Sequence, residues 1–189
     1  MAIQQRVYDL DSFWRFVCQP DNADRYFELI DGEIIEMAPP GGEHSTVAGE
    51  IYLHFRLFDP QRNLGVPTVE AGYYPPGKRD IVLAPDAAFT RAERAPEPFP
   101  RTWVPVMPDI AVEVQSPSNS LAELRRKAAI YLHHGTQLVW IILPERRSAE
   151  VCRLDANGKI QTEFIDSEGV LSGEPVLPGF RLEIARLFI

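Results

Sequence analysis

Two acidic residues are the best candidates for chemistry in this sequence, because each adjoins an apolar run. Asp86 follows a first run, and Glu113 lies inside a second, Ile110–Val114. Side chains alternate between the two faces of a β-strand, so Glu113 shares one face with Gln115. A carboxylate in a buried strand needs a cation, hydrogen bonds or a metal ion, since burying an uncompensated charge is costly. Glu113 is therefore expected to have a partner.

A lysine downstream of this strand can supply that partner. Ser120 and Glu123 have the spacing of a helix capping box, and they predict a helix that ends at Gly135. Lys127 lies beside the apolar stripe of this helix, so its side chain can lean toward the strand ends. Two alternatives stay open: Lys127 can be a surface lysine whose stem covers apolar residues, and Glu113 can form a purely structural salt bridge.

The elements that must position these side chains predict an α/β (α+β mixed) fold. Asp31-Gly32 between two apolar strands indicates an N-terminal hairpin, and the turn at 155–158 indicates a C-terminal one. The unbroken apolar run at 137–143 predicts a strand that is covered on both faces. The remaining predicted elements are helices over 7–18 and 44–58, strands over 65–74 and 80–90, and a long surface connection over 91–108.

Length and composition indicate one domain. The chain has 189 residues, of which 45% are hydrophobic, enough for one well-packed core and few for two. We therefore expect a single domain over residues 1–189. Cys18 and Cys152 match no metal-ligand or redox spacing, which indicates reduced thiols. Residues 1–20 lack a continuous apolar core, so we expect no signal peptide, no membrane span and a cytoplasmic location.

The charge of the chain limits how it can contact nucleic acid. A formal net charge of −8 argues against a broad, non-specific DNA-binding surface. Short basic clusters occur at Lys78-Arg79, Arg125–Lys127 and Arg146-Arg147. Clusters of this size are more often solvated surface than phosphate contacts. Any contact with nucleic acid is therefore expected to be local or mediated by a divalent cation.

Several motifs in a fixed order resemble known families. The acids Asp86 and Glu113, with Gln115 two positions after the second, resemble the PD-(D/E)XK nuclease superfamily, in which a lysine normally stands at the position of Gln115. In some members that lysine lies on the following helix, where Lys127 stands here. The motifs over residues 24–188 together resemble the Uma-two family of restriction endonucleases. They are Tyr26–Ile34, His44, Pro85–Phe89, Val112–Ser118, Lys127 with Tyr131 and Gly135, Val139–Ile142 and Leu177–Phe180.

The resemblance implies a restriction-endonuclease-like core, in which helices flank a central mixed β-sheet and the acids meet at one sheet edge. It also implies a homodimer that hydrolyses phosphodiester bonds of nucleic acid, with DNA favoured. Asp86 and Glu113 would hold Mg²⁺ or Mn²⁺ through oxygen ligands, with Glu28 as a third acid. Lys127 would act as a fixed cation at the transition state, and Gln115 would hydrogen-bond the attacking water.

Other residues have a functional and a structural interpretation of similar weight. His44 would bind substrate or assist proton transfer, but a histidine at a helix start can equally be a local hydrogen-bonding residue. Glu28 can instead face solvent on its strand, and Glu50 is a weaker candidate for an additional ligand. Asp86, taken alone, is a turn residue after a proline.

Two other functions stay open beside the nuclease. The fold can be a catalytically degenerate module that binds nucleic acid or protein without cleavage, which Gln115 at the usual lysine position and the acidic net charge favour. The retention of both acids favours an enzyme, because a module that only binds does not need them. A metal-dependent hydrolase of another phosphate ester is the third possibility.

Overall fold

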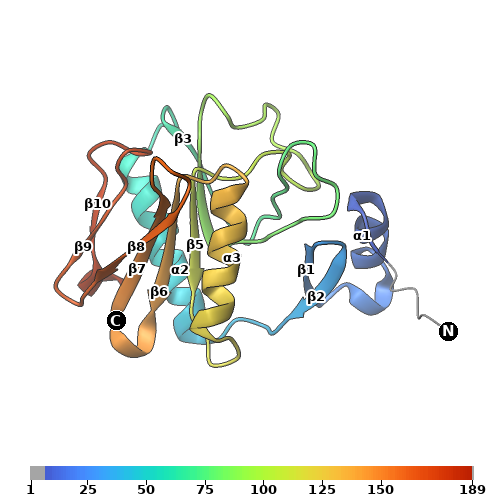
Figure 1. The fold of residues 1–189 in the computed structure, drawn as a ribbon, viewed down its shortest axis with the longest axis horizontal. Helices are drawn as coiled ribbons and strands as arrows, with labels where there is room; N and C mark the ends of the chain where they lie inside the picture. The colour runs from blue at the N-terminus through green and yellow to red at the C-terminus, as the bar shows by residue number, and fades with distance from the viewer. Residues whose placement is uncertain (1–6, 189) are drawn as a thin grey trace.

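The fold is that of a computed structural model, which describes residues 7–188 (Figure 1). The predictions of one domain over 1–189 and of no signal peptide in 1–20 extend onto residues 1–6 and 189, which lie outside the described residues. In the described part of the chain, no helix combines the length and apolar character needed to cross a membrane. Cys18 is exposed and Cys152 is buried, and both are free thiols.

A six-stranded mixed sheet forms the centre of the molecule, in the strand order β3-β4-β5-β6-β7-β8. The strands β5 and β6 are parallel, and each of the other neighbouring pairs is antiparallel. The bounds are β3 Gly65–Val69, β4 Ala87–Arg91, β5 Ile110–Val114, β6 Leu138–Leu143, β7 Ser148–Leu154 and β8 Ile160–Ile165. This architecture confirms the predicted mixed sheet, and β7–β8 is the predicted C-terminal hairpin.

One long helix covers each face of this sheet (Figure 1). The helix α2, Gly42–Phe58, packs on the face that carries Ile110, Val112 and Val114. The helix α3, Leu121–His133, connects the parallel strands β5 and β6 and packs on the face that carries Ala111. The predicted capping box is present, because Ser120 and Glu123 each accept from the other's backbone N–H. Strand alternation thus places Glu113 on the α3 side of the sheet.

The N-terminal elements form a separate layer beside α3. The strands β1, Tyr26–Ile30, and β2, Glu33–Met37, pair as the predicted two-stranded hairpin. Its turn residues Asp31 and Gly32 have φ values of 51° and 79°, the left-handed region that the turn requires. The helix α1, Leu10–Val17, is capped by Asp9 and packs with the hairpin. The smaller elements are η1 Pro20–Asn22, η2 Pro144–Arg146, β9 Val170–Ser172, β10 Arg181–Glu183 and η3 Ile184–Leu187.

The predicted bounds of two strands are wrong. Instead of running over 65–74, β3 ends at Val69, because Glu70 adopts a left-handed φ of 50° that a regular strand does not allow. Instead of beginning at residue 80, β4 begins at Ala87. The chain between them makes only isolated bridges, Leu29 with Val82 among them. This bridge joins the hairpin to the segment that leads to Asp86.

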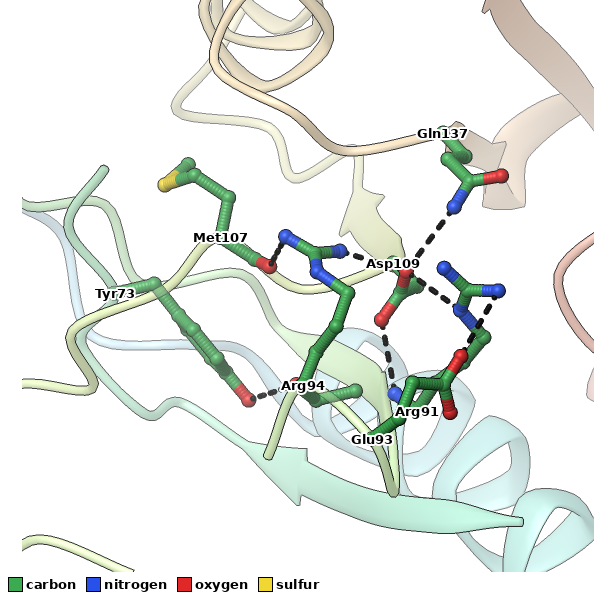
Figure 2. Close-up of polar contacts among 8 residues, drawn as sticks. Tyr73, Arg91, Glu93, Arg94, Met107, Asp109 and Gln137 are labelled. Carbon is green, nitrogen blue, oxygen red and sulfur yellow. Dashed lines mark hydrogen bonds and ion pairs between the residues drawn. The ribbon is translucent and has the colours of Figure 1, made fainter. Parts of the chain in front are cut away.

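A buried carboxylate fixes the start of β5 (Figure 2). Asp109 is completely buried, and its Oδ1 accepts hydrogen bonds from Arg91 Nε at 3.0 Å, Arg94 Nη1 at 2.6 Å and Gln137 Nε2 at 3.2 Å. Its Oδ2 accepts from the backbone N–H of Arg91 at 2.9 Å. These bonds tie the connection 91–108 to the sheet at the end of β5 that is farther from Glu113.

We expect Asp109→Asn to lower the free energy of unfolding by about 2 kcal/mol, since hydrogen bonds to a charged group contribute about 1.5–3 kcal/mol. The amide keeps one acceptor but loses the charge that faces Arg91 and Arg94. Urea unfolding followed by circular dichroism measures the change. Glu183→Gln, which breaks an exposed ion pair with Arg186, is the control and should change stability by less than about 1 kcal/mol. Equal effects of the two variants would contradict the prediction.

Candidate active site

The strand register brings the two predicted acids together. In the antiparallel pair β4–β5, Ala87 lies opposite Val112, so the preceding residue, Asp86, reaches the end of β5 beside Glu113. The backbone N–H of Val114 donates to Asp86 Oδ2 at 2.6 Å, which fixes this carboxylate at the strand end. The acids therefore meet where β4 begins and β5 ends, inside the sheet order rather than on an edge strand.

Lys127 links Glu113 to a second glutamate. Its Nζ lies 2.8 Å from Glu113 Oε2 and 3.0 Å from Glu28 Oε1, and all three side chains are buried. Glu28 comes from the hairpin and Lys127 from α3, so this ammonium joins three separate elements. An ammonium has three N–H donors, and these contacts use two of them. The third donor can reach a substrate oxygen or a water molecule.

Each carboxylate has further fixed donors. Tyr131, one helical turn after Lys127, donates its hydroxyl to Glu113 Oε1 at 2.8 Å. The backbone N–H of Ala84 donates to Glu28 Oε1 at 2.8 Å. Glu28 Oε2 is buried and has no hydrogen-bond partner among the described residues. A buried carboxylate oxygen without a donor is costly, so this atom is available to a ligand.

The low solvent exposure shifts the pKa values of these groups. Burial raises the pKa of Glu113; the charge of Lys127 opposes the rise, and the charges of Asp86 and Glu28 add to it. Burial acts to lower the pKa of Lys127, but Glu113 and Glu28 outweigh it and hold that pKa above its usual range. The neighbouring acids therefore favour the charged form of Lys127. Perturbed groups of this kind concentrate at functional sites.

His44 reaches the same group of side chains from the first turn of α2. Its Nε2 lies 3.1 Å from Asp86 Oδ2, and its Nδ1 is buried without a partner among the described residues. Burial acts to lower the pKa of His44, but the hydrogen bond and charge of Asp86, followed by the charges of Glu113 and Glu70, raise it overall. His44 is thus held in a fixed orientation by one of the two acids.

The five side chains line one cavity of about 960 Å³, whose walls come from the hairpin and from α3. They are Glu28, His44, Asp86, Glu113 and Lys127. Among the described residues, Gln115 and Glu50 do not line it. The backbone N–H of Gln115 donates to Ile142 O at 2.9 Å. Glu50 Oε2 lies 3.8 Å from Nδ1 of His54 on the same helix. The structure thus brings the predicted residues together, apart from Gln115 and the weak candidate Glu50.

Comparison with known proteins gives the family. Residues 13–185 match the model of the Uma2 family, described as "Putative restriction endonuclease". The chain belongs to the Uma2 family. No curated protein matches the chain significantly. A crystal structure at 1.96 Å resolution, described as "a putative nuclease belonging to DUF820 from Anabaena variabilis ATCC 29413", is similar with a TM-score of 0.80 and 23% identity. The alignment covers 96% of this chain and 97% of that chain, and supports the fold.

Membership of the Uma2 family supports a nuclease function and a nucleic-acid substrate. It confirms the family resemblance that the sequence motifs indicate. Gln115 stands where the sequence pattern normally has a lysine. In this chain, Lys127 of α3 contacts Glu113 directly. The neighbouring helix thus places an ammonium group beside the second acid.

The donor set fits a magnesium ion that keeps most of its waters. Among residues 7–188, no group of three or more histidine, cysteine, aspartate or glutamate side chains forms a ready-made metal cage. Mg²⁺ is usually held by one or two carboxylates together with water and substrate phosphate, so it needs no such cage. Both contacts of Asp86 fall on Oδ2, which leaves Oδ1 without a partner among the described residues. The oxygens of Glu113 each keep a second lone pair.

Two further residues join this Uma2 site without being predicted in it. Tyr131 follows the helical spacing of a core residue, and only the structure shows that its hydroxyl points at Glu113. Glu70 lines the cavity and adds its charge to that around His44. Its left-handed backbone, with φ of 50°, is the kind of strained position that functional sites concentrate. No sequence pattern around Glu70 indicates this conformation.

Proposed function

We propose that this protein is a divalent-metal-dependent endonuclease that hydrolyses phosphodiester bonds of nucleic acid, with DNA favoured. The observation that carries the proposal is the buried ammonium of Lys127 between Glu113 and Glu28, next to Asp86 and open to one cavity. A structural ion pair needs only one carboxylate per ammonium. A phosphate carries negative charge, which the ammonium of Lys127 can bind. The surrounding acids can hold a metal ion.

Each side chain has a distinct role in this proposal. Asp86 and Glu113 would hold Mg²⁺ or Mn²⁺, with Glu28 as a further acid near it. When bound, the metal ion would polarise the phosphate and lower the pKa of a water molecule. Lys127 would donate its free N–H to the attacked phosphate and stabilise the charge that develops there. His44 would orient Asp86 and contact substrate through Nδ1.

A degenerate binding module is the second candidate function. Its supporting observation is that Lys127 and Tyr131 already occupy one lone pair on each oxygen of Glu113. If these bonds only stabilise the fold, Mg²⁺ would bind weakly and Glu113→Ala would leave that binding unchanged. A hydrolase of another phosphate ester would cleave a small nucleotide-like ester but no polynucleotide.

Incubation with supercoiled plasmid and single-stranded DNA tests the proposal directly. Nicking or cleavage that requires Mg²⁺ or Mn²⁺ and stops on addition of EDTA is expected. The absence of cleavage with either metal, on either DNA, would contradict it and leave the degenerate module as the better candidate. We also propose a homodimer in the cytoplasm; sedimentation of the purified protein tests the dimer.

Removing one hydroxyl should reveal how strongly Glu113 depends on its neighbours. Tyr131→Phe is expected to reduce metal affinity and cleavage by about 10-fold, since residues that orient a metal ligand contribute about 10–100-fold. Titration with Mn²⁺ and cleavage rates measure the effect. Tyr73→Phe is the matched control, because Tyr73 is also fully buried and its hydroxyl contacts Thr68 at 2.7 Å, away from the acids. An unchanged metal affinity in Tyr131→Phe would contradict this role.

A further inference from the structure

The face of the hairpin that carries Glu28 also carries several apolar side chains beside it. Alternation along β1 puts Tyr26 on the same face as Glu28, two residues away, or about 7 Å along the strand. Residues directly opposite in an antiparallel pair share a face, and Met37 lies opposite Tyr26 while Ile35 lies opposite Glu28. Tyr26, Ile35 and Met37 therefore surround the buried glutamate on one surface. All three line the same cavity as the acids.

Packing within residues 7–188 does not explain these side chains. The opposite face of the hairpin already packs on α1 through Phe27, Leu29 and Ile34. A hairpin with one packed face normally has a polar second face. Here Tyr26 and Ile35 are 45% and 39% exposed. An exposed apolar surface that continues into a site with buried acids indicates a ligand with an apolar part.

A third wall of the cavity adds the indole N–H of Trp103, whose ring itself stacks on Phe13 of α1. Trp103, from the connection between β4 and β5, lines the cavity, and its indole N–H is buried without a partner among the described residues. The volume of about 960 Å³ matches pockets that enclose compounds with a few rings. A nucleobase offers what these walls can bind, because it has a flat face for stacking and edge atoms for hydrogen bonds.

The burial of the acids restricts how a polynucleotide can reach them. Glu113 and Lys127 are 3% and 8% exposed, so the reacting phosphodiester must enter the cavity. The nucleotides on either side must then leave the stack of a continuous duplex, as they do in enzymes whose reaction takes place in a pocket.

The charges near the cavity also favour a short, single strand. Within the described part of the chain, the arginine and lysine side chains that line it are Arg25, Arg126 and Lys127. Arg25 is paired with Glu36, and Lys127 is paired with two glutamates. A duplex bound along its backbones requires many phosphate contacts, and each must be neutralised. Stacking on an apolar surface requires fewer cations.

We propose that Tyr26, Ile35 and Met37 form a stacking site for unpaired bases, with the indole N–H of Trp103 as a donor at its edge, so that the substrate is a single-stranded or locally unpaired polynucleotide. The expected preference in cleavage rests on the proposed nuclease function. Base recognition itself requires no cleavage. The stacking site and the acids are therefore separable in experiments.

Binding without catalysis is the first test. In EDTA, fluorescence anisotropy should show that the full-length protein binds a labelled single-stranded DNA at least about 10-fold more tightly than the same sequence as a duplex. Tyr26→Ala should weaken single-strand binding by about 10-fold, because one base loses the aromatic ring on which it stacks. Phe164→Ala is the control, because Phe164 is 59% exposed on the distant edge strand β8. Single-stranded RNA of the same sequence in a third arm shows whether the sugar matters.

Cleavage in Mg²⁺ is the second test, with a duplex, a duplex that contains a central unpaired loop, and a single strand. Cuts confined to unpaired regions support the proposal, and a continuous duplex cut as fast as the single strand overturns it while the nuclease function stands. No cleavage together with Tyr26-dependent binding overturns the nuclease function alone. The stacking site is overturned if the protein does not bind single-stranded DNA. It is also overturned if Tyr26→Ala changes the oligomeric state and leaves binding unchanged.

Discussion

Glu113→Gln should lower the rate of metal-dependent cleavage by about 10³-fold, equivalent to about 4 kcal/mol of transition-state stabilisation. The amide keeps the shape and one acceptor for Tyr131, but it removes the negative charge needed to hold a divalent cation. Asp86→Asn should have a similar effect, because the two acids meet at the ends of paired strands. Both variants should also lose binding of Mn²⁺, measured by isothermal titration in the absence of DNA.

A second buried glutamate provides a matched control for this prediction. Glu150 of β7 is 5% exposed, and it pairs with Arg125 of α3 as Glu113 pairs with Lys127. Both glutamates lie in register with Ile141, on the face of the sheet that α3 covers. Glu150→Gln should therefore keep metal binding and cleavage, with circular dichroism confirming the fold. Equal loss in Glu150→Gln and Glu113→Gln would show that Glu113 serves the structure.

Lys127→Met should reduce cleavage by about 10²-fold and lower the free energy of unfolding by about 3 kcal/mol. Methionine fills the space of the lysine stem but leaves Glu28 and Glu113 buried without their shared cation. The rate must be compared under conditions in which the variant is fully folded, as urea unfolding establishes. A purely structural lysine would give the loss of stability alone.

Two variants separate the charge of Lys127 from its shape. Lys127→Arg keeps the cation and should regain part of the stability while cleavage stays low, since a planar guanidinium places its donors differently. Lys159→Met, in the exposed turn between β7 and β8, removes a lysine far from the acids and should change neither quantity. Full activity of folded Lys127→Met would contradict the proposed role.

Local signals in the sequence predict the elements that position the site. Asp31-Gly32 predicts the hairpin because both turn residues require a left-handed backbone. Ser120 and Glu123 predict the start of α3 because they satisfy each other's backbone donors. Alternation predicts the face of Glu113, and helical spacing predicts that Lys127 leans toward it. These features depend on neighbours within a few residues, which the sequence displays.

Contacts between distant segments lack such signals. The hydrogen bond from the Val114 N–H to the Asp86 carboxylate depends on the register between β4 and β5. Alternation alone does not fix that register. Tyr131 has the spacing of a core residue whether or not its hydroxyl meets a carboxylate. Asp109 stands before an apolar strand as many turn residues do, and its burial depends on arginines from the preceding connection. The sequence leaves open which side of its strand Glu28 faces, because that depends on how the hairpin packs beside α3.

The separate hairpin has a consequence for how substrate preference can be changed. Its strands form a sheet of their own, joined to the chain before Asp86 through the Leu29–Val82 bridge. Positions 26, 35 and 37 can therefore mutate without altering the β4–β5 register that holds Asp86 and Glu113. Changes at these three positions would alter the surface around the cavity while Asp86 and Glu113 keep their places in the sheet. Under the proposed stacking function, exchanging these three side chains while keeping Glu28, which pairs with Lys127, should change the substrate preference.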